Sequence, residues 1–548
     1  MEVWHQLYAP VGGSVVSALI ASIPLIALFY MLAVRKAKGH HAALVAVVCA
    51  FLCAVIVWGM PVSIAASSFV YGAAFGLFPI IWIVITAVWV YNMTVDSGDF
   101  EHIKTSIARL TDDRRLQAIF IAFAFGSFLE GTAGFGTPVA ITAAMLTGLG
   151  FQPIYAAGMC LIANTAPVAF GAIGVPVIVA GQVSGISDLH ISAYVGHQLP
   201  LLSVFVPMWL CCAMCGFKRA LEVLPAILVA GVCFAGSQFF FSTYHGPTLP
   251  DIMSALSAII GLMILLRVWK PGQIWRFEGE PEAKESTGPM PSTGEVLRAW
   301  SPFIILAIMV FLWGLPQFKN LLNSVPGAVI TFAWPGVDGM VMRTAPIVPE
   351  PTVYAAKFTF NWLSAGGTAI LIGGFLAVPF MPKYSFGRAI GCLIKTTYVL
   401  RFPILTISLI LGLAYLMNYS GMSSTLGIAF TLTGAAYPFF APLLGWLGVF
   451  LTGSDTSSNA LFCGMQRSTA EVVGMDPTLA VASNSSGGVT GKMISPQSIS
   501  VATAATGMVG QEGNLFRFAL PHSLAMTLIV CVLTWLQSGP LKWMLPTF

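Results

Sequence analysis

The chain has 548 residues, of which 57% are hydrophobic and only 8% carry a formal charge. Soluble domains contain roughly 25% charged residues, so this composition excludes a soluble globular fold. The apolar runs continue over about twenty residues, as in membrane-crossing helices, and do not alternate over about ten residues as β-barrel strands do. The net charge of +4 comes from short basic loops and indicates no nucleic acid partner.

In chain order, apolar windows of about twenty residues predict twelve membrane-crossing helices. They lie near residues 11–34, 42–59, 72–92, 153–180, 193–216, 222–241, 250–268, 299–315, 364–382, 402–418, 478–500 and 518–538. The ten cysteines lie almost all inside these runs, so we interpret them as small core residues and expect no metal site.

Two further apolar stretches, 118–149 and 436–470, are interrupted at their midpoints by Gly, Thr, Ser and an acid. Each is best explained as a re-entrant hairpin, in which two half-helices are joined by a turn. The predicted fold is therefore an all-α polytopic membrane protein with about twelve transmembrane helices and two re-entrant hairpins.

Short basic loops predict the orientation in the membrane. Five such loops fall on one side when twelve crossings are assumed: Arg35, Lys36 and Lys38; Lys104, Arg109, Arg114 and Arg115; Lys218 and Arg219; Arg267, Lys270 and Arg276; Lys383, Arg388 and Lys395. The positive-inside rule makes this side cytoplasmic and places both termini outside. A polar, flexible linker is predicted at 270–298, and the outer segment 316–360 has no assigned role.

An internal repeat is the strongest signal. GSFLEGT, from Gly126, matches GVFLTGS, from Gly448, and ANTAPVAFG, from Ala163, matches SNSSGGVTG, from Ser483. Chance similarity explains Leu and Phe matches, but it explains ordered Gly, Asn and Ser/Thr matches poorly. The predicted topology inverts the copies, which is typical of secondary transporters. We expect a first inverted repeat at 1–216, two connecting spans with the linker at 217–298, and a second repeat at 299–548.

Four stretches also carry a family resemblance. FLEGTAGFGTPVAITAA, NTAPVAFGAIGVPV, GWLGVFLTGSDTSSNALF and GGVTGKMISPQSI resemble signature stretches of the bacterial L-lactate permease family. The resemblance implies proton-coupled uptake of L-lactate, with D-lactate and glycolate as co-substrates, in the bacterial inner membrane. It also implies kinship with the ion-transporter superfamily, whose paired re-entrant hairpins sit in a mobile transport domain.

Broken helices suggest where a small carboxylate would bind, because free N–H groups and helix dipoles stabilise an anion. Thr137-Pro138 is a good helix start in the first hairpin. We predict further breaks at Asn164-Thr165 and Asn484-Ser485. The candidate substrate-binding residues on these broken ends are Thr137, Asn164, Thr165, Ser454, Thr456, Ser457, Asn459, Asn484 and Ser485. For each of them, helix capping or packing between helices is the alternative explanation.

Charges inside the membrane are rarer and more informative. Glu130 and Asp455 lie at the predicted hairpin tips, where an ionised, unpaired carboxylate costs several kcal/mol. We therefore predict that they couple transport to protons, the alternative being a neutral or capping role. Lys492 is the candidate cation, either for the substrate carboxylate or for Asp455, unless it snorkels to the surface. Gln497 beside it would complete a polar lining.

The predicted function is proton-coupled symport of short 2-hydroxy monocarboxylates. Sodium coupling is the alternative, because backbone carbonyls and hydroxyls at broken helices also suit Na⁺. An integral-membrane enzyme is disfavoured because the sequence has no convergent cluster of His and carboxylates. The expected partners are the monocarboxylate, the proton and the lipid bilayer, without a cofactor, and a homo-oligomer is left open.

Overall fold

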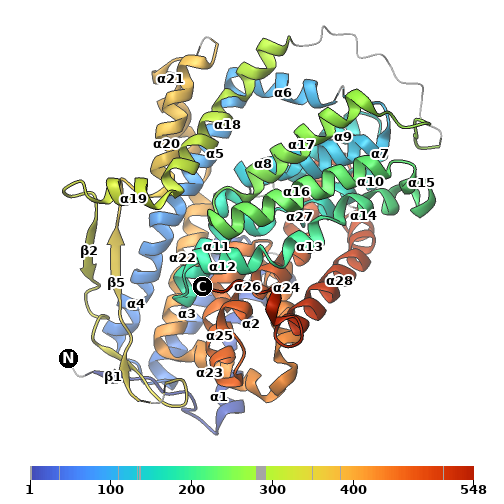
Figure 1. Ribbon diagram of the computed structural model, residues 1–548. Coiled ribbons are helices and arrows are strands. Elements are labelled where there is room, and N and C mark those ends of the chain that lie inside the picture. The colour runs from blue at the N-terminus through green and yellow to red at the C-terminus, as the bar shows by residue number, and fades with distance from the viewer. Residues whose placement is uncertain are drawn as a thin grey trace.

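The computed structural model describes residues 3–35, 37–108, 110–132, 134, 137–278, 292–348, 350–382, 384–509 and 511–548. These residues form a large assembly of helices with two small sheets at one edge (Figure 1). Residues 279–291 of the predicted linker, and Lys36, Arg109 and Lys383 of the basic loops, lie outside the described residues.

Helices make up most of both halves of the chain. In the first half they are α1 (Ser14–Ala21), α2 (Ile23–Phe29), α3 (Gly39–Leu52), α4 (Val62–Phe75), α5 (Trp82–Ser97), α6 (Asp99–Ala108), α7 (Arg114–Gln117), α8 (Gly126–Thr132), α9 (Thr137–Gly148), α10 (Pro153–Ala163), α11 (Gly171–Ser184), α12 (Asp188–Val195), α13 (Leu199–Ser203), α14 (Val206–Cys215), α15 (Phe217–Leu221), α16 (Leu224–Tyr244) and α17 (Pro250–Val268). In the second half they are α18 (Thr293–Gly314), α19 (Pro316–Asn323), α20 (Gly366–Ala377), α21 (Phe386–Val399), α22 (Arg401–Ser420), α23 (Met422–Phe430), α24 (Tyr437–Thr452), α25 (Asp455–Val473), α26 (Pro477–Lys492), α27 (Pro496–Thr506) and α28 (Glu512–Gln537).

Short π-helical and 3-10 segments connect or extend several of these helices. They are η1 (Tyr30–Val34), η2 (Cys53–Val57), η3 (Gly76–Ile81), η4 (Ala118–Phe125), η5 (Val168–Phe170), η6 (Val378–Phe380), η7 (Thr431–Ala436) and η8 (Lys542–Met544).

The predicted multi-span helical class is confirmed. Among the described residues, ten helical stretches are long and apolar enough to cross a membrane, and the pair Pro153–Ala163 and Val168–Ser184, bent by 63°, would be an eleventh. The predicted spans near 364–382 and 478–500 are not among them, because the first is a short apolar helix and the second is divided into α26 and α27. The count of twelve is therefore not confirmed.

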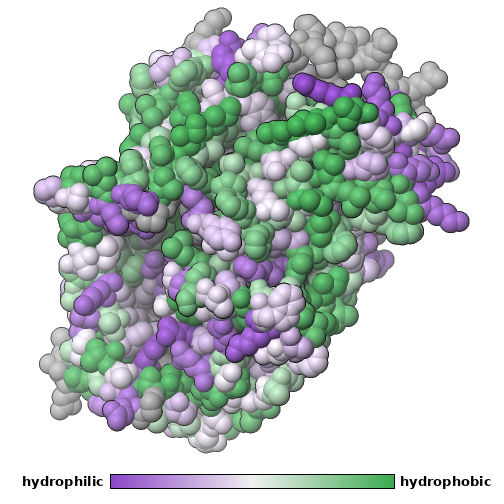
Figure 2. Space-filling view, in the orientation of Figure 1, coloured by the Kyte–Doolittle hydropathy of each residue, from purple (hydrophilic) through white to green (hydrophobic). Residues whose placement is uncertain are grey.

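The outer surface is that of a protein surrounded by lipid. Figure 2 shows broad hydrophobic areas in the upper half of the view, where Figure 1 places α16, α17 and α18. On α16, for example, Leu228, Val232 and Phe240 are exposed. Hydrophilic side chains gather at the upper right, around α15. Apolar patches of this extent fit burial in a bilayer and not contact with water.

The outer segment 316–360 contains strands that the all-α prediction does not include. β2 (Ile330–Ala333) pairs antiparallel with β5 (Lys357–Phe360), and both are rich in the aromatic and β-branched residues that favour strands. A second sheet has the order β1-β3-β4, with β1 (Trp4–His5) parallel to β3 (Val341–Arg343) and β4 (Thr352–Val353) antiparallel to it. The N-terminal strand is thus tied to this segment.

The two predicted hairpin stretches each divide into two helices near the expected midpoint. In the second, α24 ends at Thr452, Gly453 adopts a left-handed φ of 73°, and α25 begins at Asp455. The two arms pack against each other. In the first, α8 ends at Thr132 and α9 begins at Thr137, and residues 133, 135 and 136 of the tip lie outside the described chain. That these hairpins are re-entrant stays a prediction.

The predicted break at Asn484-Ser485 is wrong, because α26 runs unbroken through it. The small residues there serve close helix packing, which is common between membrane helices. A Cβ atom added to Gly487 would lie only 2.1 Å from the carbonyl oxygen of Pro442 in α24. The chain breaks instead at residues 493–495, between α26 and α27.

The two breaks in the structure are separated by the spacing of the matching sequences. Ala172, Ile173 and Gly174 leave helical geometry, and α11 continues through Pro176. In the second half, α27 begins at Pro496, which is 320 residues after Pro176 and thus keeps the spacing of the repeat. Proline suits the first turn of a helix because its missing N–H would have no helical partner there.

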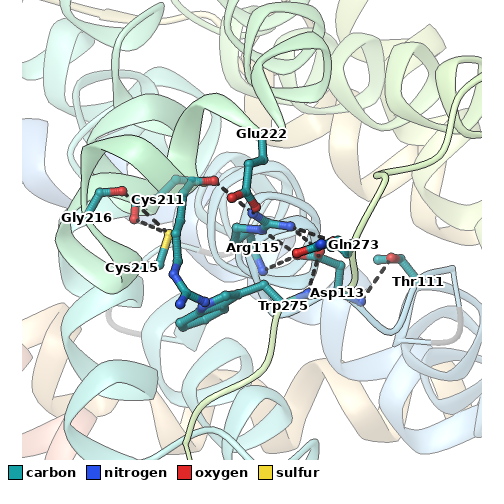
Figure 3. A network of polar contacts seen from close by, with 10 residues as sticks. Thr111, Asp113, Arg115, Cys211, Cys215, Gly216, Glu222, Gln273 and Trp275 are labelled. Atoms are coloured by element: carbon teal, nitrogen blue, oxygen red, sulfur yellow. Dashed lines mark hydrogen bonds and ion pairs between the residues drawn. The ribbon is translucent and has the colours of Figure 1, made fainter.

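A buried network ties the base of the first hairpin to two other segments (Figure 3). Arg115 in α7 pairs with Asp113 at 2.7 Å, and both side chains are fully buried. Its guanidinium also donates to Glu222 and to the carbonyl oxygens of Arg219 and Gln273. Three of the predicted basic loops therefore lie together, in agreement with their assignment to one side of the membrane.

Replacing Arg115 with methionine should strongly destabilise the protein. The change leaves the buried Asp113 carboxylate without its cation, and removing one partner of a buried pair costs about 3–5 kcal/mol. We expect a clearly lower midpoint of thermal unfolding in detergent solution, measured by tryptophan fluorescence. Arg388→Met is the matched control, because the Arg388–Asp96 pair is 48% and 44% exposed and such pairs contribute about 0–1 kcal/mol. Equal shifts in both variants would contradict this interpretation.

Candidate functional site

Four interrupted helix ends converge on one small cavity, which we call the central cavity. Its wall is formed by the two hairpin tips, the break before α11 and the break between α26 and α27. The lining residues are Glu130, Gly134, Val168, Gly171, Ala172, Pro176, Gly453, Ser454, Asp455, Thr456, Lys492, Gln497, Ser498 and Val501. The centres of water-sized molecules can occupy about 50 Å³ of it, whereas one water needs roughly 10–15 Å³ on this measure. The cavity therefore suits a small ligand.

The first break, at residues 172–174 near the start of α11, has a strained backbone. Ala172 and Ile173 adopt left-handed conformations, with φ of 45° and 59°, which are unfavourable for residues with a Cβ and most of all for a β-branched one. Next to them, Gly171 packs against Glu130, and a Cβ added to Gly171 would lie 2.7 Å from Glu130 Oε1. The turn thus presses the start of α11 against the first hairpin.

The second hairpin tip presents a capped helix start. Ser454 Oγ accepts a hydrogen bond from the N–H of Ser457 at 3.2 Å, and Asp455 occupies the first turn of α25. A serine cap and an acid in the first turn stabilise the free N–H groups and the positive end of the helix dipole. Ser495 caps α27 in the same way, by accepting from the N–H of Ser498.

An ion pair between the two halves of the chain lies in the cavity wall. Lys492 Nζ is 2.8 Å from Glu130 Oε1, and the two side chains are 10% and 3% exposed. This burial argues against Lys492 snorkelling to the surface. The sequence suggested Asp455 as an alternative partner for Lys492, and the structure pairs Lys492 with Glu130 instead. Within the described chain, Glu130 Oε2 has no hydrogen-bond partner.

Neutral donors hold Asp455, which is why it does not require Lys492. Asp455 Oδ2 accepts hydrogen bonds from Ser485 Oγ and from Asn459 Nδ2. Asn459 Nδ2 also donates to the carbonyl oxygen of Pro176 at 3.0 Å, so the Asp455 carboxyl is linked to the first break. Asp455 Oδ1 has no partner among the residues that the structure describes.

A chain of buried amides continues behind Asp455. Asn484 Nδ2 donates to Asn459 Oδ1 at 2.9 Å, and Gln466 Nε2 donates to Asn484 Oδ1 at 3.0 Å. Tyr437 donates its hydroxyl proton to Gln466 Oε1. Because these residues come from α24, α25 and α26, the polar chain fixes the three helices relative to one another.

Most of the predicted site residues lie at or next to the central cavity. Those that line it are Glu130, Ser454, Asp455, Thr456, Lys492 and Gln497. Asn459 and Ser485 contact Asp455, and Asn484 lies one hydrogen bond further away. The structure thus brings together predicted residues from both halves of the chain.

Other predicted residues do not line the cavity. Asn164 and Thr165 directly follow α10 and are buried. Their side-chain polar atoms have no hydrogen-bond partner among the described residues. Ser457 contributes its backbone N–H to the Ser454 cap. The side chain of Thr137 lies outside the described part of the chain, so its role stays a prediction.

Asp251 is a further buried acid that was not predicted from the sequence. It lies in the first turn of α17, is 1% exposed, and neither carboxyl oxygen has a hydrogen-bond partner among the described residues. It packs against the first hairpin, where a Cβ added to Gly131 would lie 2.7 Å from Asp251 Cβ, and it is within Coulombic range of Glu130 and Lys492. Its position at the start of the predicted span 250–268 could have identified it, because acidic residues inside the membrane are rare.

The central cavity can bind an anion and exchange a proton in the same place. Lys492 supplies an ammonium group, and Ser454, Thr456 and Gln497 supply neutral hydrogen-bonding groups. Glu130 and Asp455 supply carboxyl groups that can take up or release a proton. The interior position shields these groups from water, which strengthens their mutual interactions.

Comparison with known proteins places the chain in one family. The family model for L-lactate permease matches residues 17–539. The chain is 50% identical to the glycolate permease GlcA of Escherichia coli K12, over 98% of each chain. It is 48% identical to the L-lactate permease of Bacillus subtilis 168, over 99% of this chain and 100% of that protein.

Among solved structures, the YdaH transporter of Alcanivorax borkumensis aligns with 87% of this chain and 88% of its own, at a TM-score of 0.44 and 14% identity. That similarity is too low to carry an argument about the site. The family match, by contrast, includes both hairpins, both breaks and every residue that lines the central cavity. The chain belongs to the L-lactate permease family.

Proposed function

We propose that this chain is a symporter that takes up L-lactate and related 2-hydroxy monocarboxylates, such as D-lactate and glycolate, together with a proton. The observation that carries the proposal is the buried Glu130–Lys492 ion pair in the wall of the central cavity. The substrate class comes from the relatives, which are a glycolate permease and an L-lactate permease.

The ion pair provides a reason for coupling. In the empty cavity the Glu130 carboxylate and the Lys492 ammonium neutralise each other. When a proton binds to Glu130, the ammonium becomes available to the substrate carboxylate, and the sum of the charges stays zero. A substrate anion without the proton would add a net negative charge in the membrane interior, which is costly. Anion and proton therefore enter together.

The neutral groups of the cavity complete the substrate contacts. We place the substrate carboxylate against Lys492 and its 2-hydroxyl against the hydroxyls of Ser454 and Thr456 or the amide of Gln497. Asp455, held by Ser485 and Asn459, is the second candidate for the proton. Because the loaded cavity carries no additional charge, it can cross the membrane field without the roughly 2.3 kcal/mol per charge per 100 mV that a charged one would require.

The family and the basic loops suggest the membrane in which the protein works and its orientation there. We propose a location in the bacterial cytoplasmic membrane with both termini outside, as the positive-inside rule predicts. The hairpins and the broken helices form the part that moves, in two inverted repeats.

The function is tested by uptake of labelled L-lactate into proteoliposomes. We expect an inward proton gradient to drive accumulation above the external concentration and unlabelled glycolate and D-lactate to compete. A sodium gradient at equal pH on both sides is the parallel condition. Accumulation driven by sodium alone would favour the sodium-coupled alternative, and an absence of lactate uptake under every gradient would contradict the proposal.

The ion pair itself is tested by a double-mutant cycle. Lys492→Met should destabilise the protein, because it leaves the Glu130 carboxylate buried and unpaired. Glu130→Gln combined with Lys492→Met should recover most of the lost stability, with a coupling energy of about 0.5–3 kcal/mol. The measurement is thermal unfolding in detergent. The same cycle on the exposed pair Glu101–Lys104 is the control, for which we expect little coupling; additive effects at 130 and 492 would refute the pairing.

The coupling role of Glu130 is tested by Glu130→Gln. Glutamine mimics the protonated carboxyl permanently. The variant should therefore no longer accumulate lactate against its concentration gradient when a pH gradient is applied, and should only equilibrate lactate across the membrane. It should keep exchange of internal for external lactate, because exchange requires only the loaded carrier to reorient. The measurements are accumulation ratio and counterflow in proteoliposomes.

Asp455→Asn is the matched variant for this test, since it removes the other carboxyl of the cavity by the same isosteric change. We expect it to retain a pH-dependent accumulation ratio. If Glu130→Gln accumulates lactate with normal pH dependence while Asp455→Asn does not, the coupling role belongs to Asp455.

A further inference from the structure

A second cavity, which we call the outer cavity, lies between the outer segment 316–360 and the helices that form the central cavity. Its volume for the centres of water-sized molecules is about 390 Å³. Strand residues of the outer segment line it together with α4, α22, the end of α11 and α25. The proposed function does not use it, and the sequence analysis assigned the outer segment no role.

The outer cavity is strongly cationic. Its lining contains Arg343, Lys357 and Arg467 and no acidic residue. Arg467 pairs with Glu471 at 2.7 Å. Arg343 and Lys357 have no ion pair among the residues that the structure describes, and the acid within Coulombic range of Arg343, Glu471, is the one that pairs with Arg467. Three cations around one recess, with a single acid near them, favour an anion there.

The guanidinium of Arg343 is held in a fixed orientation. Its Cζ lies 4.0 Å from the ring centroid of Tyr354, and that ring stacks on Tyr419 with centroids 4.3 Å apart. Stacking on an aromatic face stabilises a cation and fixes the plane of the guanidinium, which matches a planar carboxylate with two parallel hydrogen bonds. The rings also offer an apolar wall to the carbon end of a small organic acid.

Three of the four tyrosine hydroxyls of the cavity are already used as donors. Tyr71 donates to the carbonyl oxygen of Lys357 at 2.8 Å, and Tyr419 donates to that of Ala355 at 2.7 Å. Tyr415 donates to the carbonyl oxygen of Gln182 at 3.3 Å. The first two bonds attach the outer segment to α4 and α22. The side chains of Arg343 and Lys357 supply the charged donors for a ligand.

The two cavities share two helices. On α25, Thr456 lines the central cavity and Arg467 lines the outer one, about 16 Å apart along the helix axis. On α11, Pro176 lines the central cavity and Gly185, directly after the helix, lines the outer one. An anion in the outer cavity thus lies near the C-terminal ends of two helices whose N-terminal ends surround the central cavity.

We propose that the outer cavity is a capture site for a small organic carboxylate on its way to the central cavity, with Arg343 and Lys357 as its main ligands. The proposal rests on the proposed function, because the captured anion is the transported one. The site raises the local concentration of the anion and increases the rate of encounter, an effect that salt weakens.

The first experiment measures initial rates of L-lactate uptake in proteoliposomes at low and high ionic strength. At low ionic strength, the variant Arg343→Gln with Lys357→Gln should show a several-fold lower kcat/KM and a nearly unchanged kcat. Its kcat/KM should also depend less on salt than that of the parent protein. Arg388→Gln, which removes a cation that lines neither cavity, should behave like the parent. Parent-like kcat/KM and salt dependence in the double variant would overturn the proposal.

The single variant Lys357→Gln distinguishes the loss of charge from structural damage that Arg343→Gln could cause. Lys357 is exposed on β5, so its replacement removes a charge without disturbing the stacked rings. The single variant should change kcat/KM and its salt dependence in the same direction as the double variant. If Lys357→Gln has no such effect, the loss in the double variant is structural and the proposal is wrong.

The second experiment measures binding independently of transport, by calorimetric titration of L-lactate in detergent. The background is Glu130→Gln with Lys492→Met, which keeps the central cavity neutral and removes its cation. We expect weak, salt-sensitive binding that disappears when Arg343→Gln is added. Absence of binding in this background, with normal transport by the parent, would overturn only the proposal that the outer cavity captures the anion. Binding that depends on Arg343, with no lactate uptake by the parent, would overturn the proposed function alone.

Discussion

The Glu130–Lys492 ion pair is the interaction on which the rest of the structure depends. A lone carboxylate or ammonium at that depth would cost several kcal/mol, and the pair removes this cost only because both groups arrive at the same point from opposite halves of the chain. Gly171 leaves room for the carboxyl, and the end of α26 carries the ammonium. The mutual neutralisation of these two charges is therefore a property of tertiary structure.

Close helix packing holds this arrangement in place. Small residues let α24 and α26 approach until backbone touches backbone, as at Gly445, where an added Cβ would lie 1.8 Å from the carbonyl oxygen of Asn484. The amide chain through Asn459, Asn484 and Gln466 then fixes α25 against the pair. Asp455 keeps its position through neutral donors, so the cavity contains two carboxyl groups in different environments, one paired with a cation and one not.

The two cavities differ in charge, although they share α11 and α25. In the central cavity the one cation is balanced by Glu130, whereas the outer cavity has cations without acids in its lining. A recess with uncompensated positive charge attracts anions from solution, and a balanced site accepts an anion only with a compensating proton. The first property favours capture and the second favours coupling, so the two cavities suit successive steps of one transport cycle.

The sequence by itself determined the membrane class, most of the spans, both hairpin breaks and six residues of the cavity wall, because these depend on composition and on local Gly, Pro and Ser/Thr signals. It misplaced the break at Asn484, since small polar residues mark close packing as well as interruption. Only the tertiary structure decided that Lys492 pairs with Glu130, that Asp251 packs against the first hairpin, and that the outer cavity forms. Each joins residues far apart in the chain, 362 positions in the case of Glu130 and Lys492, and no local pattern specifies which distant side chains meet.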